Sequence, residues 1–126
     1  MARLLLLLLA TLAVMQAEVY ELRTYTTHPG KLDTLHARFR NHTIKLFEKH
    51  GMTNMMYWVP QDEPRKSNTL IYVVKHKSRQ AAEASWKAFR EDPAWIKVKT
   101  ETEAPGPIVQ KVESVFMDLA PYSPAK

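Results

Sequence analysis

Three polar side chains of complementary chemistry alternate near the start of the sequence. Glu21, Arg23 and Tyr25 stand two residues apart in the stretch VYELRTY, and this spacing places them on one face of a β-strand. A guanidinium presents a planar fork of N–H donors that matches a carboxylate. Arg23 is therefore predicted either to form a structural ion pair with Glu21 or to bind an anionic substrate, and the sequence leaves both options open.

The remaining residues of this stretch predict which way the polar face points. Tyr20 and Leu22 lie on the opposite face, and they suit packing against helices better than Glu21 and Arg23 do. We therefore expect the polar face to line a cavity on the side of the sheet away from the helices. Tyr57, in a second predicted strand, and Tyr25 are candidate hydrogen-bond donors to a substrate in that cavity, with simple packing as the alternative role.

His36 is the candidate general base, because imidazole titrates near neutral pH. A hydrogen-bonded histidine at the edge of the core is the alternative reading. His36, His42 and His50 are separated by six and eight residues, whereas two metal ligands on one helix need a spacing of four. No metal site and no cofactor are therefore expected, although haem binding stays open because an axial haem ligand needs a single histidine.

Hydropathy patterns predict the elements that position these residues. A three- to four-residue apolar period predicts a helix from Leu32 to a stop at Gly51, and a second helix over residues 79–91. Asp92 and Pro93 are typical of the start of a further short helix. Alternation and β-branched residues predict strands over 19–26, 54–59, 69–76 and 108–119.

The resulting order, βαββαβ, is that of the ferredoxin-like split βαβ unit. It predicts an α+β fold with one antiparallel four-stranded sheet, covered by helices on one face only. Both faces of the strands carry apolar residues, among them Ile71, Val73, Val115 and Met117. An uncovered apolar face of this size is typical of an interface, so we expect a homodimer in which this face is buried.

The N-terminus has the pattern of a secretory signal peptide. A short basic start is followed by the apolar run LLLLLLATLAV and by Ala17 at a plausible cleavage point. The run is shorter than the roughly 20 apolar residues of a membrane span. We expect a cleaved signal peptide over residues 1–17, a single domain over 18–126, a secreted or periplasmic location and no transmembrane span after cleavage; an uncleaved anchor is the alternative.

Charge and cysteine content narrow the classes of partner. Cleavage would leave 17 basic and 13 acidic residues, a net charge of +4. These charges are dispersed, whereas nucleic-acid-binding modules carry a clustered basic stripe, so no nucleic-acid partner is expected. The sequence contains no cysteine, which rules out a disulfide framework. The stability of the domain must therefore come from its core or from subunit pairing.

Five stretches in order resemble the NIPSNAP domain family. They are YELRTYTTHPGKL, YW at 57–58, SNTLIYV, DPAW and LAPYSP, and they span nearly all of the chain after residue 17. The resemblance implies a dimeric α/β barrel, in which two sheets close around a shared cavity. Related barrel families include cofactor-free monooxygenases, haem-degrading enzymes, isomerases and small-molecule sensors.

Together, the residues and the resemblance predict an exported homodimer that binds a small organic molecule, with an anion as one option, in the barrel cavity. Whether it is an enzyme is left open. An oxygenase- or isomerase-like version would use His36 as the base, with Arg23 and Tyr25 orienting a carboxylate or enolate. The alternative is a non-catalytic scaffold for a protein or a membrane surface. A cavity of roughly a few hundred Å³ with convergent polar groups would favour ligand binding.

Overall fold

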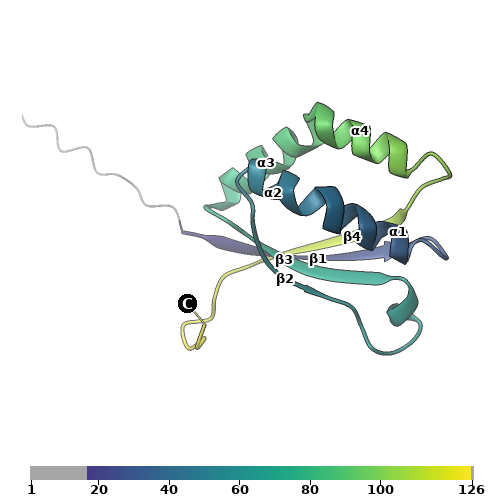
Figure 1. Cartoon of the computed structure of the whole chain (residues 1–126). Coiled ribbons are helices and arrows are strands. Elements are labelled where there is room, and N and C mark those ends of the chain that lie inside the picture. The colour runs from purple at the N-terminus through teal and green to yellow at the C-terminus, as the bar shows by residue number, and fades with distance from the viewer. Residues whose placement is uncertain (1–16, 126) are drawn as a thin grey trace, which may run out of the picture.

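The computed structural model describes residues 17–125 and shows one sheet with all the helices on one side (Figure 1). The sheet order is β2-β3-β1-β4, and every pairing is antiparallel. The four strands are β1 (Val19–Thr27), β2 (Thr53–Trp58), β3 (Thr69–His76) and β4 (Val109–Met117). This is the α+β, ferredoxin-like arrangement that the sequence predicts. The predicted signal peptide falls almost entirely outside the described residues.

The predicted first helix contains a π-helical turn. Its parts are α1 (Leu32–Arg38), the π-helical turn η1 (Phe39–Thr43) and α2 (Ile44–Lys49). The hydroxyl of Thr43 donates to the carbonyl oxygen of Arg38, five residues earlier, at 3.3 Å. The sequence pattern does not reveal this turn, because Leu35, Phe39 and Thr43 are all buried as the regular stripe predicts. Turns of this kind are frequent at functional sites.

The later helices begin where the sequence places them. The bounds are α3 (Arg79–Glu91) and α4 (Pro93–Thr102), with a short 3₁₀ turn, η2 (Arg65–Ser67), between β2 and β3. Ser78 caps α3 by accepting from the amide of Ala81 at 2.9 Å. Asp92 caps α4 in the same way and also accepts from Lys49 and His50, both at 2.7 Å. The cap therefore ties the end of α2 to the junction of α3 and α4.

The predicted orientation of β1 is wrong: its polar face lies under the helices. The indole N–H of Trp86, in α3, donates to the carboxylate of Glu21 at 2.7 Å. The guanidinium carbon of Arg23 lies 4.1 Å from the centre of a Trp86 ring. Hydropathy misled the prediction because Glu21 and Arg23 neutralise each other, and a buried polar group costs little once it is hydrogen-bonded.

The uncovered face of the sheet is apolar, as predicted. The register places Leu22 between Val73 and Val115. Met56 is 60 % exposed and Trp58 45 % exposed on this side. The C-terminal segment after β4 also turns to this side of the sheet (Figure 1), where residues 118–120 and 122–124 form a groove with Tyr20, Val73 and Met117.

Aromatic side chains fill the layer between sheet and helices. Tyr72 is fully buried at its centre and stacks on Tyr57, with ring centres 5.0 Å apart. Phe39 and Phe47 cover Tyr72 from the first helical segment.

Among residues 17–125, no helix is long and apolar enough to cross a membrane. Within the same range, no cluster of three or more His, Asp or Glu residues is placed to hold a metal ion.

Candidate functional site

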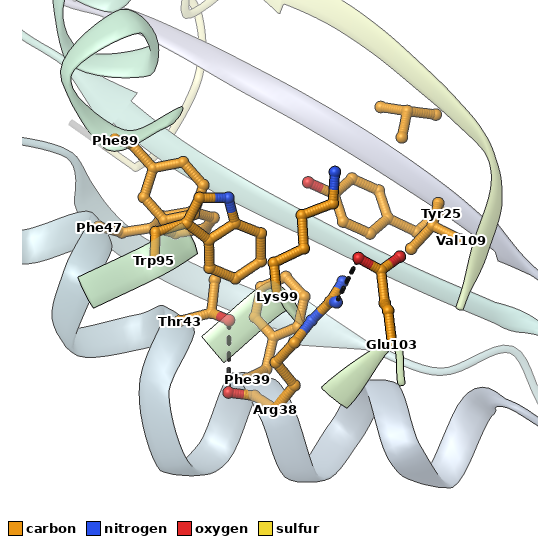
Figure 2. A pocket seen from close by; sticks show the side chains of 11 residues that line it. Tyr25, Arg38, Phe39, Thr43, Phe47, Phe89, Trp95, Lys99, Glu103 and Val109 are labelled. Atoms are coloured by element: carbon orange, nitrogen blue, oxygen red, sulfur yellow. Dashed lines mark hydrogen bonds and ion pairs between the residues drawn. The ribbon is translucent and has the colours of Figure 1, made fainter. Parts of the chain in front are cut away.

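A cavity of about 250 Å³ lies between the sheet and the helices. We call it the helix–sheet cavity. It exceeds the roughly 150 Å³ of an engineered cavity that binds benzene, and it is smaller than the roughly 300–1,000 Å³ of drug-sized sites. Its size therefore suits a molecule with one small ring or a short chain. The lining residues, drawn in Figure 2, are Tyr25, Arg38, Phe39, Thr43, Phe47, Phe89, Trp95, Lys99, Glu103, Val109 and Val112.

Arg38 carries a buried charge with weak partners. Its side chain is 5 % exposed, and its only ion pair among the described residues is with Glu103, at 3.9 Å. Its side chain also donates a 3.4 Å hydrogen bond to the hydroxyl of Thr102, and its Nε has no hydrogen-bond partner among residues 17–125. Charge-assisted bonds are normally about 2.7–2.9 Å long. Burial lowers the pKa of Arg38, with Glu103 and Tyr25 acting in the opposite direction, but an arginine stays charged in a protein.

The walls of the cavity divide into an aromatic part and a charged part. Phe47, Phe89 and Trp95 gather on one side, whereas Arg38 and Glu103 lie on the other (Figure 2). The guanidinium carbon of Arg38 is 5.0 Å from the centre of a Trp95 ring, and the rings of Phe89 and Trp95 are 4.6 Å apart. The cavity can therefore hold a molecule that has an apolar body and one anionic end.

Tyr25 closes the sheet side of the cavity, and its hydroxyl is hydrogen-bonded to Tyr72 and Arg23. Its hydroxyl oxygen accepts from Tyr72 at 2.7 Å and from Arg23 at 3.2 Å. The hydroxyl of Tyr72 accepts in turn from the Nε of Arg23 at 3.0 Å. Burial raises the pKa of Tyr72, so it stays a neutral donor. The two hydroxyl groups share one hydrogen bond, so the pair keeps one O–H without an acceptor among residues 17–125.

Glu21 is the counter-charge of Arg23, with 2.8 Å between Nη1 and Oε2. The structure thus contains the predicted structural pair. Burial by itself raises the pKa of Glu21, but hydrogen bonds outweigh burial and bring the pKa down to about 2. The partners, all within 2.9 Å, are His76, Ser114, Arg23 and Trp86. This carboxylate is therefore charged at neutral pH, and both of its oxygens already accept hydrogen bonds from the protein.

The structure distributes the predicted site residues over three hollows. Tyr25 lines the helix–sheet cavity, whereas Glu21 and Arg23 line a neighbouring cleft. His36 and Tyr57 meet in a third hollow, outside the helix–sheet cavity. The hydroxyl of Tyr57 donates to Asn54 at 2.5 Å. The predicted grouping of His36 with Arg23 and Tyr25 around one ligand is therefore not present in this chain.

Sequence reasoning missed the charged half of the helix–sheet cavity. Arg38 follows Leu35 by three residues in the apolar stripe, so a charge at an inward position was the signal that could have identified it. Trp95, Lys99 and Glu103 are four residues apart, which places them on one face of a helix. The sequence therefore predicts that these three side chains share a face, but it does not predict which face of α4 meets the sheet.

Comparisons with solved structures agree on the fold. An uncharacterized NIPSNAP-like domain protein from Burkholderia xenovorans has a TM-score of 0.72 at 13 % identity, over 86 % of this chain and 90 % of that one. A NIPSNAP family protein of unknown function from Agrobacterium tumefaciens has a TM-score of 0.73 at 18 % identity, over 88 % and 96 %. SnoaB, a cofactor-independent oxygenase from Streptomyces nogalater, is more distant, with a TM-score of 0.56 at 14 % identity, over 86 % and 98 %.

The comparison with protein-family models shows to which family the chain belongs. At these identities the structural matches show the shared fold alone. A search among curated proteins finds no match. The family model described as NIPSNAP matches residues 20–124, from the second residue of β1 to beyond the end of β4, with every helix of the described chain in between. The protein belongs to the NIPSNAP family.

Proposed function

We propose that this protein is an exported, homodimeric binder of a small organic acid, held in the helix–sheet cavity. The acid's apolar body would lie against Phe47, Phe89 and Trp95, and its carboxylate would face Arg38. The observation that carries the proposal is the buried guanidinium of Arg38, with its 3.9 Å ion pair and an Nε that has no partner.

Electrostatics supports an anionic ligand. A buried charge without a well-placed partner costs several kcal/mol, and Glu103 is too far from Arg38 to form a short, charge-assisted bond. A ligand carboxylate could approach the guanidinium directly and offset part of that cost. Tyr25, from the sheet, and Lys99, from α4, also line the cavity, and a phenol and an ammonium group can both donate to an anion.

Dimerisation and export rest on separate arguments. The uncovered face of the sheet exposes Met56, Trp58 and Val115, and water contact with such a face is unfavourable. A second copy of the chain offers a matching apolar face. Export is supported by the basic and apolar order of the first 17 residues.

Native mass spectrometry of the protein purified from its own host tests these proposals together. We expect twice the subunit mass, with a small acid released on denaturation. Titration with benzoate and its neutral analogue benzamide, followed by calorimetry, should show preferential binding of the acid. A preparation without ligand that also fails to distinguish benzoate from benzamide would contradict the proposal and favour the scaffold function. Conversion of the released acid under oxygen would instead identify an oxygenase-like activity.

A further inference from the structure

A second cleft, of about 320 Å³, lies between α3 and strands β1 and β4. It contains three arginines, Arg23, Arg79 and Arg90, and we call it the arginine cleft. We propose that the arginine cleft binds an oxyanion of the phosphate class, separately from the helix–sheet cavity. This proposal goes beyond the acid-binding function above and does not depend on it.

Arg23 provides donors at the base of the cleft. Its side chain is only 16 % exposed and is held on three sides. One N–H is directed at Glu21, one at Tyr72 and one at Tyr25. A guanidinium has five N–H groups, so two have no acceptor among the described residues. Because Arg23 lines the cleft, a ligand bound there could accept hydrogen bonds from these two N–H groups.

Arg79 and Arg90 add charge from the helix side. The guanidinium carbon of Arg79 lies 3.6 Å from the ring centre of Phe116, in β4. This stacking fixes the guanidinium plane while leaving its N–H edges free to bind. In the described chain, neither Arg79 nor Arg90 forms an ion pair with a carboxylate. No carboxylate of the described chain therefore lies within 4.0 Å of either guanidinium group.

The charge count favours an anion with several oxygens. The carboxylates that line the cleft are Glu21 and Glu83. Glu21 is occupied by four partners, and Glu83 is exposed on α3. Three guanidinium groups therefore outnumber two carboxylates. A phosphate group offers three or more acceptor oxygens, enough to meet three arginines, whereas a carboxylate has only two.

Trp86 is a built-in reporter for this site. Its indole N–H bonds to Glu21 and its ring lies under Arg23, so an anion in the cleft should shift its indole resonance. We would titrate the protein with inorganic phosphate and with phenyl phosphate, and record the ¹H–¹⁵N indole signals, assigned with Trp86→Phe. We expect a saturable shift of the Trp86 signal and little change at Trp58. Tighter binding of phenyl phosphate would identify a phosphate ester as the ligand, and equal binding would identify free phosphate.

Charge-matched variants decide whether the cleft is specific. Arg79→Gln and Arg90→Gln should each weaken phosphate binding by about tenfold or more, as expected for the loss of a charge-assisted bond. Arg65→Gln removes the same charge from the exposed η2 turn and should leave binding unchanged. Arg23→Met is less informative, because it also unpairs Glu21.

Two results would overturn the proposal: no saturable shift of the Trp86 signal, or equal weakening by Arg65→Gln and Arg79→Gln. The second would mean that phosphate responds only to overall charge. Arg38→Met separates this site from the helix–sheet cavity. It should reduce benzoate binding while phosphate still shifts the Trp86 signal.

Discussion

At the scale of single residues, the half-buried Arg23 and the buried Arg38 differ in how well they are paired. Arg23 has a carboxylate at 2.8 Å and two tyrosine hydroxyls as acceptors. Arg38 is paired only with the carboxylate of Glu103, at 3.9 Å, and its Nε has no hydrogen-bond partner in the described chain. Within the protein, the charge of Arg23 is therefore neutralised by Glu21. The second arrangement, that of Arg38, is the less stable one, and the proposed binding of an organic acid rests on it.

Replacing Arg38 by Met tests this difference directly. Met keeps much of the apolar stem and removes the charge, so benzoate binding should weaken by about 10- to 100-fold, the worth of a charge-assisted hydrogen bond. Benzamide binding should not change, as measured by calorimetry. Arg40→Met, at an exposed position of η1, is the matched control. Equal losses for acid and amide would show that Arg38 acts through packing rather than charge.

The lowered pKa of Glu21 predicts how the unfolding free energy changes with pH. Its pKa is about 2 in the folded protein and about 4.5 as an ordinary glutamate. Because the folded pKa is the lower one, its contribution is fully present above about pH 4.5 and is lost as pH falls toward 2. The difference corresponds to about 3 kcal/mol of unfolding free energy.

Urea unfolding at a series of pH values checks this contribution. Glu21→Gln should be less stable than the wild type at pH 7 and should lose the Glu21 part of the decline between pH 4.5 and 2. The depressed pKa of Asp92 contributes a decline in the same direction that the variant keeps. Glu91→Gln, at the exposed end of α3, should retain the wild-type profile. A Glu21→Gln variant with an unchanged acid profile would rule out this assignment.

At the scale of elements, short junctions position the helix–sheet cavity. The π-helical turn η1 contributes Phe39 and Thr43 to the cavity wall, directly after Arg38. The cap residue Asp92 sets the start of α4, which brings Trp95, Lys99 and Glu103 over the sheet. Helix α3 contributes Phe89 from its inner face. Capping and turn geometry thus decide which side chains meet in the cavity.

The cap of α3 gives a prediction at this scale. Ser78→Ala removes the oxygen that accepts from the Ala81 amide, and it should lower the unfolding free energy by about 1 kcal/mol. Chemical denaturation measures this value. Ser85→Ala in the same helix removes a hydroxyl that makes no hydrogen bond in the described chain, and it should cost less. If the two variants are equally stable, the cap contributes nothing.

At the scale of the whole molecule, the two faces of the sheet have different roles. One face meets the helices and holds the polar network of β1 together with the helix–sheet cavity and the arginine cleft. The other face is apolar and bears the turned C-terminal segment (Figure 1). If two such sheets paired through their apolar faces, the helix–sheet cavity of each subunit would lie on the outer side of the paired sheets. Each cavity would then be built from one chain.

Val73→Asp tests the pairing of sheets. The wild type should sediment as a dimer at micromolar concentration. A charge at Val73, between Leu22 and Met56 in the register, should dissociate it or unfold it, because an unpaired buried charge costs several kcal/mol. Ala88→Asp introduces the same charge on the exposed side of α3 and should stay dimeric. A wild type that sediments as a monomer would defeat the model of paired sheets.

Export has a simple mass test. The exported protein should begin near Glu18, because Ala17 ends the predicted signal peptide. Intact mass spectrometry of the secreted or periplasmic fraction measures this directly. Full-length protein confined to the cytosol would contradict the prediction.

The sequence by itself determined the order of elements, because periodicity and caps are local signals. β3 and α3 have the predicted bounds, and Asp92 begins α4 as its sequence indicates. It also determined that one face of the sheet would be apolar and uncovered. Tertiary structure decided which face that is. Both faces of β1 can be buried, one in a hydrogen-bonded polar network and one against apolar groups, so hydropathy could not choose between them. The helix–sheet cavity likewise depends on tertiary structure. Arg38, Tyr25 and Glu103 are distant in sequence, and only the packing of helices on the sheet brings them together.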